Sequence, residues 1–269
     1  MIFFVSLSVF IFGLIVGSFL NCVIYRFEKN ESFLKGRSYC PKCKHTLNWK
    51  DLIPIFSFLI LKGKCRYCSK KISLQYPLVE LATGVLFILT FHFWSLGFNW
   101  LVGIGIWELI YLLIILCSLI VIFVYDLKHY IIPDKVIYPA ILVIGIWYLV
   151  AWMFLNQYTS YQLLVTIYSA FGAAAFFLAI VLISRGRWMG VGDIKLAFLM
   201  GLLLGFPKIL VALFSAFLIG AIIGIGLIAT GKKTLKSEVP FGPFLVTGTF
   251  LALFLGEQIV NWYSNLFLL

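Results

Sequence analysis

Charged residues are scarce in this sequence. Only 12% of its 269 residues are Asp, Glu, Lys or Arg, and 63% are hydrophobic. A soluble domain carries roughly 25% charged residues and about half apolar ones. A water-soluble fold cannot hide this much apolar surface, so we expect the lipid bilayer to surround most of the chain.

The sequence also lacks the features of a cleaved secretory signal. No basic residue precedes the first apolar run at residues 1–23, and that run lacks a small-residue cleavage site. We interpret it as a retained membrane span. The aromatic residues sit inside apolar runs and do not form a basic platform, so nucleic-acid binding is not expected.

Apolar runs alternate with polar turns along the chain. A spanning helix needs about 20 apolar residues, so the pattern predicts an all-α polytopic membrane protein with about eight transmembrane helices. The sixth run is short and interrupted by glycines. No internal repeat is evident. The runs lie near 2–24, 78–96, 100–125, 132–155, 161–183, 194–206, 209–230 and 243–266.

The 21 basic residues indicate an orientation. If the N-terminus lies outside, twelve Lys or Arg fall between the first two spans, eight fall in later cytoplasmic turns, and only Lys208 falls outside. Lys and Arg concentrate in cytoplasmic loops of membrane proteins. We therefore expect a multi-pass membrane protein with both termini outside; the family resemblance described below implies that the membrane is the bacterial cytoplasmic membrane.

Four cysteines form two close pairs in the one sizeable polar segment, residues 25–77. Cys40 and Cys43 form the first pair, and Cys65 and Cys68 follow after 21 residues. Two such pairs can complete a tetrahedron around zinc, and four thiolates leave no open position for catalysis. Disulfides are the alternative, disfavoured in a reducing cytoplasm.

The zinc would supply folding energy that this small segment lacks. We therefore divide the chain into three parts. Residues 1–24 form the first transmembrane helix, residues 25–77 a small cytoplasmic zinc-binding domain, and residues 78–269 a membrane-embedded core with about seven helices.

Only ten residues are acidic, so an acid beside an apolar run is informative. Asp126 lies at the inner end of the third run and Asp193 at the inner start of the sixth, at the same depth on the same side. Carboxylates near hydrocarbon are costly and usually functional. The structural alternative is that Asp126 pairs with Lys128 and Asp193 caps a helix.

Two carboxylates that share a site do not both ionise readily. One can remain protonated while the other activates a water for attack on a peptide carbonyl. Gly190 and Gly192 would let the backbone bend and an extended substrate approach. Lys195 would tune the Asp193 carboxylate or anchor the helix end.

The order and spacing of these motifs resemble the bacterial prepilin peptidases, membrane aspartic peptidases of the GxGD type, over nearly the whole chain. The resemblance rests on several motifs. They are Gly17-Ser18-Phe19-Leu20-Asn21, Tyr25-Arg26, both cysteine pairs, Asp51-Leu52-Ile53-Pro54, Tyr76-Pro77-Leu78-Val79-Glu80, Asp126, Ile132-Pro133-Asp134, Gly190-Val191-Gly192-Asp193 with Lys195, and Pro240-Phe241-Gly242-Pro243-Phe244.

This resemblance implies that Asp126 and Asp193 are the catalytic pair, and that the substrates are prepilins or pseudopilins with a basic leader and one apolar helix. It also implies N-methylation of the new N-terminus with S-adenosylmethionine as donor. Glu80, Asn21 and Arg26 become candidates for substrate binding or methyl transfer.

Two other classes remain as alternatives. A membrane carrier would place acids near the midplane and show paired repeats. A zinc-dependent membrane scaffold would use the aspartates only structurally.

Overall fold

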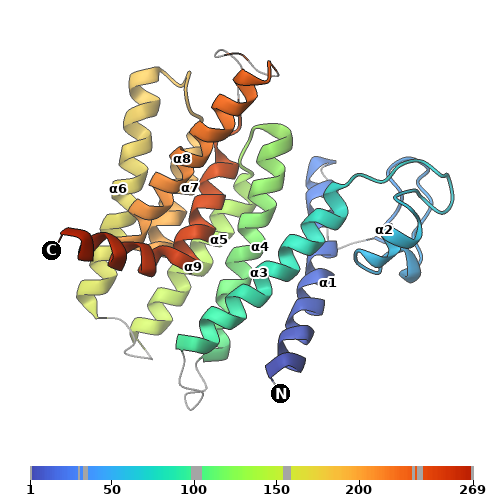
Figure 1. The fold of residues 1–269 in the computed structure, drawn as a ribbon, viewed down its shortest axis with the longest axis horizontal. Helices are drawn as coiled ribbons and strands as arrows, with labels where there is room; N and C mark the ends of the chain where they lie inside the picture. Colours follow the sequence, from blue (N-terminus) through green and yellow to red (C-terminus); the bar gives the residue numbers. More distant parts are fainter. Residues whose placement is uncertain are drawn as a thin grey trace. The chain divides into compact units, whose positions relative to one another are not determined.

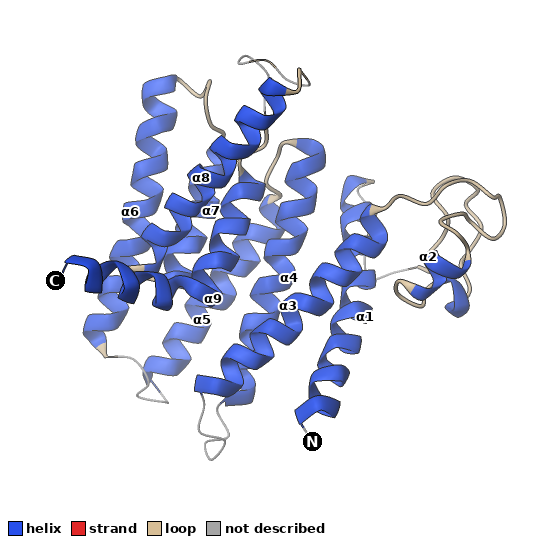
Figure 2. Cartoon of the chain, in the orientation of Figure 1, coloured by secondary structure: helices blue, strands red, loops and turns tan. Residues whose placement is uncertain are grey.

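The computed structural model describes residues 2–29, 31–32, 36–97, 105–153, 159–231, 234 and 239–267. Within these ranges the chain is helical, with two isolated β-bridges and no strand (Figure 2). The all-α prediction is therefore confirmed. The elements are α1 (Ile2–Glu28), η1 (Trp49–Asp51), α2 (Phe56–Ile60), α3 (Gln75–Gly97), α4 (Gly105–His129), α5 (Asp134–Met153), α6 (Ser160–Ser184), α7 (Val191–Leu204), α8 (Lys208–Ala229) and α9 (Gly242–Phe267).

Seven of the described helices are long and apolar enough to cross a membrane: α1, α3, α4, α5, α6, α8 and α9. Helix α7 has only 14 residues. At 1.5 Å per residue it is about 21 Å long, less than the roughly 30 Å hydrocarbon core. The sixth apolar run, which is short and interrupted by glycines, is thus a helix shorter than a full span.

The chain forms two compact units, Met1–Val121 and Ile122–Leu269. In the first unit α1 packs along α3 (Figure 1). Glycines bring the two backbones close. A methyl group added to Gly13 would lie 2.8 Å from the Cα of Gly84, and one added to Gly17 would lie 2.7 Å from the Cα of Glu80. Small residues permit such close packing of membrane helices.

In the second unit α7 contacts four other helices, namely α5, α6, α8 and α9. Seven of its residues are buried, including Leu196, Leu199 and Met200. Gly201 lies directly against the backbone of Ala170 on α6. The surrounding helices therefore fix the position of α7, and with it the first turn that carries Asp193.

Candidate active site and metal centre

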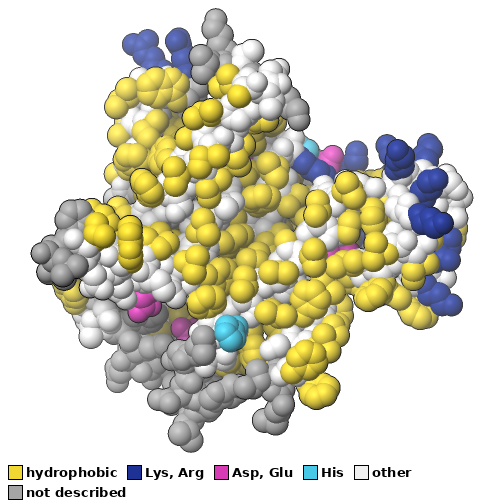
Figure 3. Space-filling model, viewed as in Figure 1, with side chains coloured by type: hydrophobic (Ala, Val, Ile, Leu, Met, Phe, Trp, Pro, Cys, Tyr) yellow, Lys and Arg dark blue, Asp and Glu magenta, His cyan; other side chains and the backbone are white. Residues whose placement is uncertain are grey.

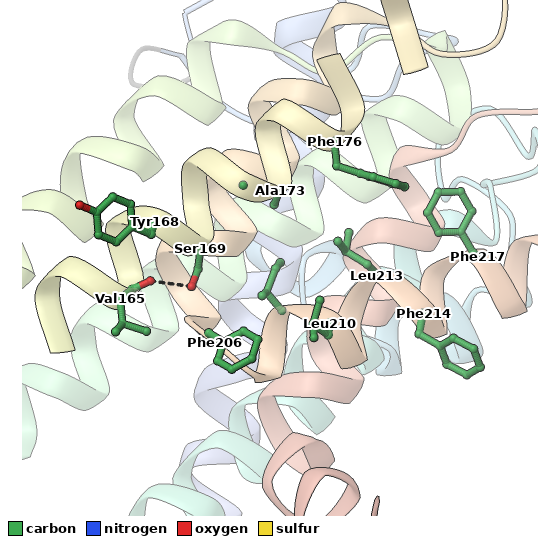
Figure 4. Close-up of a pocket in the computed structure, with 12 residues that line it drawn as sticks. Val165, Tyr168, Ser169, Ala173, Phe176, Phe206, Leu210, Leu213, Phe214 and Phe217 are labelled. Carbon is green, nitrogen blue, oxygen red and sulfur yellow. Dashed lines mark hydrogen bonds between the residues drawn. The ribbon is translucent and has the colours of Figure 1, made fainter. Parts of the chain in front are cut away.

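An apolar groove of about 590 Å³ lies between α6 and α8 (Figure 4). Its lining contains no carboxylate, histidine, lysine or arginine. The hydroxyl of Ser169 donates to the carbonyl of Val165 at 2.6 Å, so this polar group is satisfied within its own helix. The groove suits an acyl chain or an apolar side chain and offers no group for hydrolysis.

The two acids predicted to be catalytic, Asp126 and Asp193, both lie in the second unit. Asp126 lies one turn before the end of α4, and Asp193 is the third residue of α7. Both are buried, with 4% and 8% of their surface exposed. Gly192, the residue before Asp193, lies against Ile132, which is six residues after Asp126. Two acids that are 67 residues apart in sequence are thus neighbours in a largely water-excluded environment.

The first turn of α7 holds the Asp193 carboxyl in place. Its Oδ2 accepts the backbone N–H of Gly190 at 3.1 Å, which satisfies one of the free donors at the helix start. Gly192 allows close approach of the segment before α5, because a methyl group there would lie 3.1 Å from the Cβ of Ile132. Gly190 adopts an extended conformation at the N-cap, and a methyl group there would meet nothing closer than 3.9 Å.

The side chain of Lys195 pairs with Asp134 and not with Asp193. Its Nζ donates to Oδ1 of Asp134 at 2.6 Å and lies 5.1 Å from the centre of the Tyr138 ring. This ion pair links the first turn of α7 to the first turn of α5. The two roles expected for Lys195, tuning of the Asp193 carboxylate and anchoring of the helix end, stay predictions.

The sequence did not single out Gly242 as a site residue. A methyl group on Gly242 would lie 2.5 Å from Oδ2 and 3.1 Å from Cγ of Asp126. The preceding Phe241 packs against Phe217 and Phe177, with ring centres 5.0 and 6.1 Å away. This aromatic cluster fixes the start of α9 beside the carboxyl. The only sequence signal was the glycine in the Pro240–Phe244 motif.

The four cysteines of the first unit form a cluster. All four are free thiols, and their Sγ atoms lie within 4.8 Å of one another. In a tetrahedral zinc site with Zn–S bonds of about 2.3 Å, neighbouring sulfurs are about 3.8 Å apart. Cys40 and Cys68 are already 4.0 Å apart. The donor set therefore fits a metal ion, and no disulfide competes for it.

The local environment favours a thiolate at Cys40. Burial raises the pKa of this thiol, but backbone hydrogen bonds from Cys43 and Lys42 outweigh it and lower the pKa to about 7. Metals bind thiolates, so a lowered pKa assists binding near neutral pH.

Asp51 connects η1 to the turn that carries the second cysteine pair. Its carboxylate accepts hydrogen bonds from Arg66 Nε at 2.7 Å and from the Tyr67 hydroxyl at 3.1 Å. Burial raises the pKa of Asp51, yet the hydrogen bonds from Arg66, the Asn48 amide and Tyr67 together hold it below its usual value. The carboxylate stays ionised and fixes the turn between Cys65 and Cys68.

Comparison with known proteins places both sites in one family. Residues 11–94, which include the cysteine cluster, match the bacterial peptidase A24 N-terminal domain, and residues 112–225, which include both aspartates, match the type IV leader peptidase family. A Bacillus subtilis (strain 168) relative is 34% identical over 96% of this chain and 97% of its own length. The chain belongs to the type IV leader peptidase family.

Other members of the leader peptidase family match over a similar extent. A Legionella pneumophila relative is 32% identical over 97% of this chain and 94% of its own, and one from Aeromonas salmonicida (strain A449) is 30% identical over 96% and 93%. All three are named prepilin leader peptidase/N-methyltransferase. No solved structure gives a significant match.

Three further candidates lie in the N-terminal part of this family member, and all are buried. Asn21 donates to the carbonyl of Tyr76 at 3.0 Å, which ties α1 to the start of α3. Arg26 donates to the carbonyl of Ser32 at 2.8 Å and shapes the chain after α1. Each thus has a structural partner, and a role in substrate binding or methyl transfer stays a prediction.

Glu80 is the third of these candidates. Its Oε2 accepts the backbone N–H of Ile55 at 2.8 Å. Ile55 has a φ of 61°, which is strained for a β-branched residue. The Glu80 carboxylate on α3 therefore holds the strained turn at Ile55, between the two cysteine pairs.

Proposed function

We propose that this chain is a prepilin leader peptidase that cuts the basic leader from type IV pilin-like precursors and then methylates the new N-terminus. The observation that carries the peptidase activity is the pair of buried carboxyls, Asp126 and Asp193, within the region that matches the leader peptidase family. The names of the relatives support the substrate class and the second activity.

In the proposed mechanism the two carboxyls hold one water and share one proton. The ionised member takes a proton from the water as its oxygen attacks the scissile carbonyl carbon. The protonated member donates a hydrogen bond to the developing oxyanion. When the tetrahedral intermediate collapses, the C–N bond breaks, the carboxyl pair gives the leaving amine the proton that it took from the water, and the pair is again left with one shared proton. The protons belong to the pair as a unit, so neither residue is assigned a fixed role.

Gly190 and Gly192 serve this mechanism by leaving room beside Asp193. A peptide bond inside a helix is shielded by its own turn, so the substrate must be extended at the cut. The exposed, extended backbone at Gly190 offers such a segment space without a side chain in the way. We assign to Lys195 the role of anchoring this turn through Asp134.

We further propose that the cysteine cluster holds a structural zinc. Zinc would link the two turns that carry Cys40 with Cys43 and Cys65 with Cys68, and would stabilise a domain with a small core. S-adenosylmethionine is the proposed methyl donor, on the strength of the relatives' names. The described side chains do not form an identifiable cradle for this donor, so no step is derived through it.

The membrane arrangement follows from the charge distribution. We propose one transmembrane helix at 1–24, a cytoplasmic zinc-binding domain at 25–77 and a peptidase core at 78–269, in the bacterial cytoplasmic membrane with both termini outside. Twenty of the 21 basic residues then lie inside. This arrangement puts both aspartates at the cytoplasmic face, where the leader of a precursor joins its apolar helix.

The test is cleavage of a prepilin-like precursor by the purified protein in liposomes. We expect Asp126→Asn and Asp193→Asn each to abolish cleavage, because an amide can neither activate water nor carry the shared proton. Both variants should keep the wild-type melting temperature and metal content. Cleavage at the wild-type rate in either variant would remove that residue from the mechanism and would favour a carrier or scaffold role.

A further inference from the structure

The short helix α2 presents an apolar surface that no described part of the chain covers. Phe56, Leu59 and Ile60 are 61%, 63% and 73% exposed. Phe58 points the other way, because a methyl group added to Gly63 would lie 3.1 Å from its ring. Helix α2 thus has one exposed apolar face and one face that packs against the chain. We call the exposed residues Phe56, Leu59 and Ile60 the α2 patch.

The depth of the α2 patch is fixed by a hydrogen bond to a spanning helix. Ile55, the residue just before α2, donates its N–H to Glu80 at 2.8 Å. Glu80 is the sixth residue of α3, about 7.5 Å along the axis from the helix start at 1.5 Å per residue. Helix α2 therefore begins beside the second turn of a helix that is long and apolar enough to span a membrane, and we infer that this turn lies at the bilayer interface.

The outer surface of α3 at this level is apolar as well. Leu78 and Leu81 flank Glu80 and are 61% and 45% exposed. A spanning helix exposes such side chains to lipid. An exposed Phe, Leu or Ile at the same depth belongs at the boundary between headgroups and acyl chains, where amphipathic helices bind.

The charge of the same domain suits a lipid surface. Residues 36–74 contain nine Lys or Arg and a single acid, Asp51, which is already bound to Arg66. Lys and Arg side chains gather on the part of the surface that this domain forms, at the right of Figure 3. Basic segments beside a membrane are attracted to anionic headgroups, at about 1 kcal/mol per residue near the surface.

We propose that the α2 patch inserts into the phospholipid interface, with the basic residues of 36–74 on anionic headgroups. The cysteine-bearing domain then lies on the membrane and is not suspended in water. Glu80 is the positioning residue of this arrangement, because its carboxylate sets the start of α2. The proposal does not depend on the peptidase activity.

The test uses the full chain, loaded with metal, in liposomes of phosphatidylcholine with or without phosphatidylglycerol. A benzophenone amino acid replaces Ile60 in one sample, the exposed Lys42 in the matched control, and the span residue Leu81 in the positive control. After irradiation, mass spectrometry counts adducts with the acyl chains, which a probe at headgroup level, such as the one at 42, reaches less often than an inserted one. We expect adducts at 60 and 81, several-fold more than at 42, and more at 60 when anionic lipid is present.

Other outcomes would overturn the proposal. Adducts at 81 without adducts at 60 would place α2 in water. Equal labelling at 42 and 60 would show no preference for the α2 patch. Crosslinks from 60 to a second copy of the chain would make this surface a protein interface.

A second measurement guards against a folding artefact of the probe. The triple variant Phe56→Ser, Leu59→Ser, Ile60→Ser removes the α2 patch and leaves Phe58 inside. We expect it to retain its metal but to exchange the amides of 55–61 faster than wild type in liposomes. Phe58→Ser, the matched control, should weaken metal binding. Unchanged exchange in the triple variant would contradict insertion.

Discussion

At the residue scale, the contact between Gly242 and Asp126 makes a sharp prediction. We expect Gly242→Ala to slow cleavage about 10- to 100-fold, because the methyl group would push the carboxyl aside and misplacement by about 1 Å can cost that much. Alanine favours a helix more than glycine does, so α9 should not lose stability. Turnover of a prepilin-like precursor and the melting temperature would be measured together.

The matched control for this change is Gly224→Ala on α8. A methyl group there meets nothing within 4 Å, so cleavage should stay at the wild-type rate. If Gly242→Ala is fully active, the carboxyl has room to move and Gly242 does not position it. If both variants lose activity, a general effect of the substitution is responsible.

The same contact explains what the sequence could not reveal at this scale. Asp126 and Asp193 were predicted from their scarcity and placement, and Cys40, Cys43, Cys65 and Cys68 from their spacing. Gly242 is 116 positions from Asp126. Gly242 matters because its lack of a side chain leaves room for the Asp126 carboxyl. A local sequence pattern cannot show that a glycine leaves room for a residue so distant in the chain.

At the element scale, α7 depends on close backbone packing against α6. Gly201 touches the backbone of Ala170, which cannot move aside as a flexible side chain can. We expect Gly201→Leu to force the two helices apart and to cost about 1–3 kcal/mol of stability. Since α7 carries Asp193, cleavage should fall as well. Thermal unfolding in detergent and the liposome assay measure the two effects.

Gly224→Leu is the control for bulk, because its surroundings are open. It should keep the wild-type melting temperature. A Gly201→Leu variant as stable and active as wild type would mean that α6 and α7 do not need this contact.

The type of the long elements was predicted well, but their boundaries were predicted less well. The run expected at 100–125 is α4, Gly105–His129, so Asp126 lies inside the helix and not at its end. Hydropathy marks where apolar residues stop, but a helix stops where its backbone hydrogen bonds stop. The short η1 and α2 in the polar segment have no repeat long enough to show a periodicity.

At the scale of the whole molecule, we expect the cysteine-bearing segment to unfold without the membrane helices when its metal is lost. We expect Cys65→Ser to release the metal and unfold residues 36–74, because the ligands tie together a domain with few buried residues. The spanning helices should remain, since the bilayer and their own packing hold them. Metal analysis measures the release of the metal, limited proteolysis measures the unfolding of residues 36–74, and far-ultraviolet circular dichroism measures the helical content that remains.

Cys117→Ser provides the control, because Cys117 lies in α4 and outside the cluster. It should bind the wild-type amount of metal. Full metal content in Cys65→Ser would refute a four-cysteine site. A loss of most helical signal would instead mean that the metal supports the whole protein.

The sequence by itself determined the class of this protein, its family, the four cysteines that could hold a metal ion and the two candidate acids. These properties depend on composition and on spacings within a few residues, which are present before the chain folds. Only the tertiary structure decided that Gly242 abuts Asp126, that Lys195 pairs with Asp134 and that Glu80 holds Ile55. Each of these contacts joins residues brought together by helix packing, and packing depends on the shapes of many remote side chains at once.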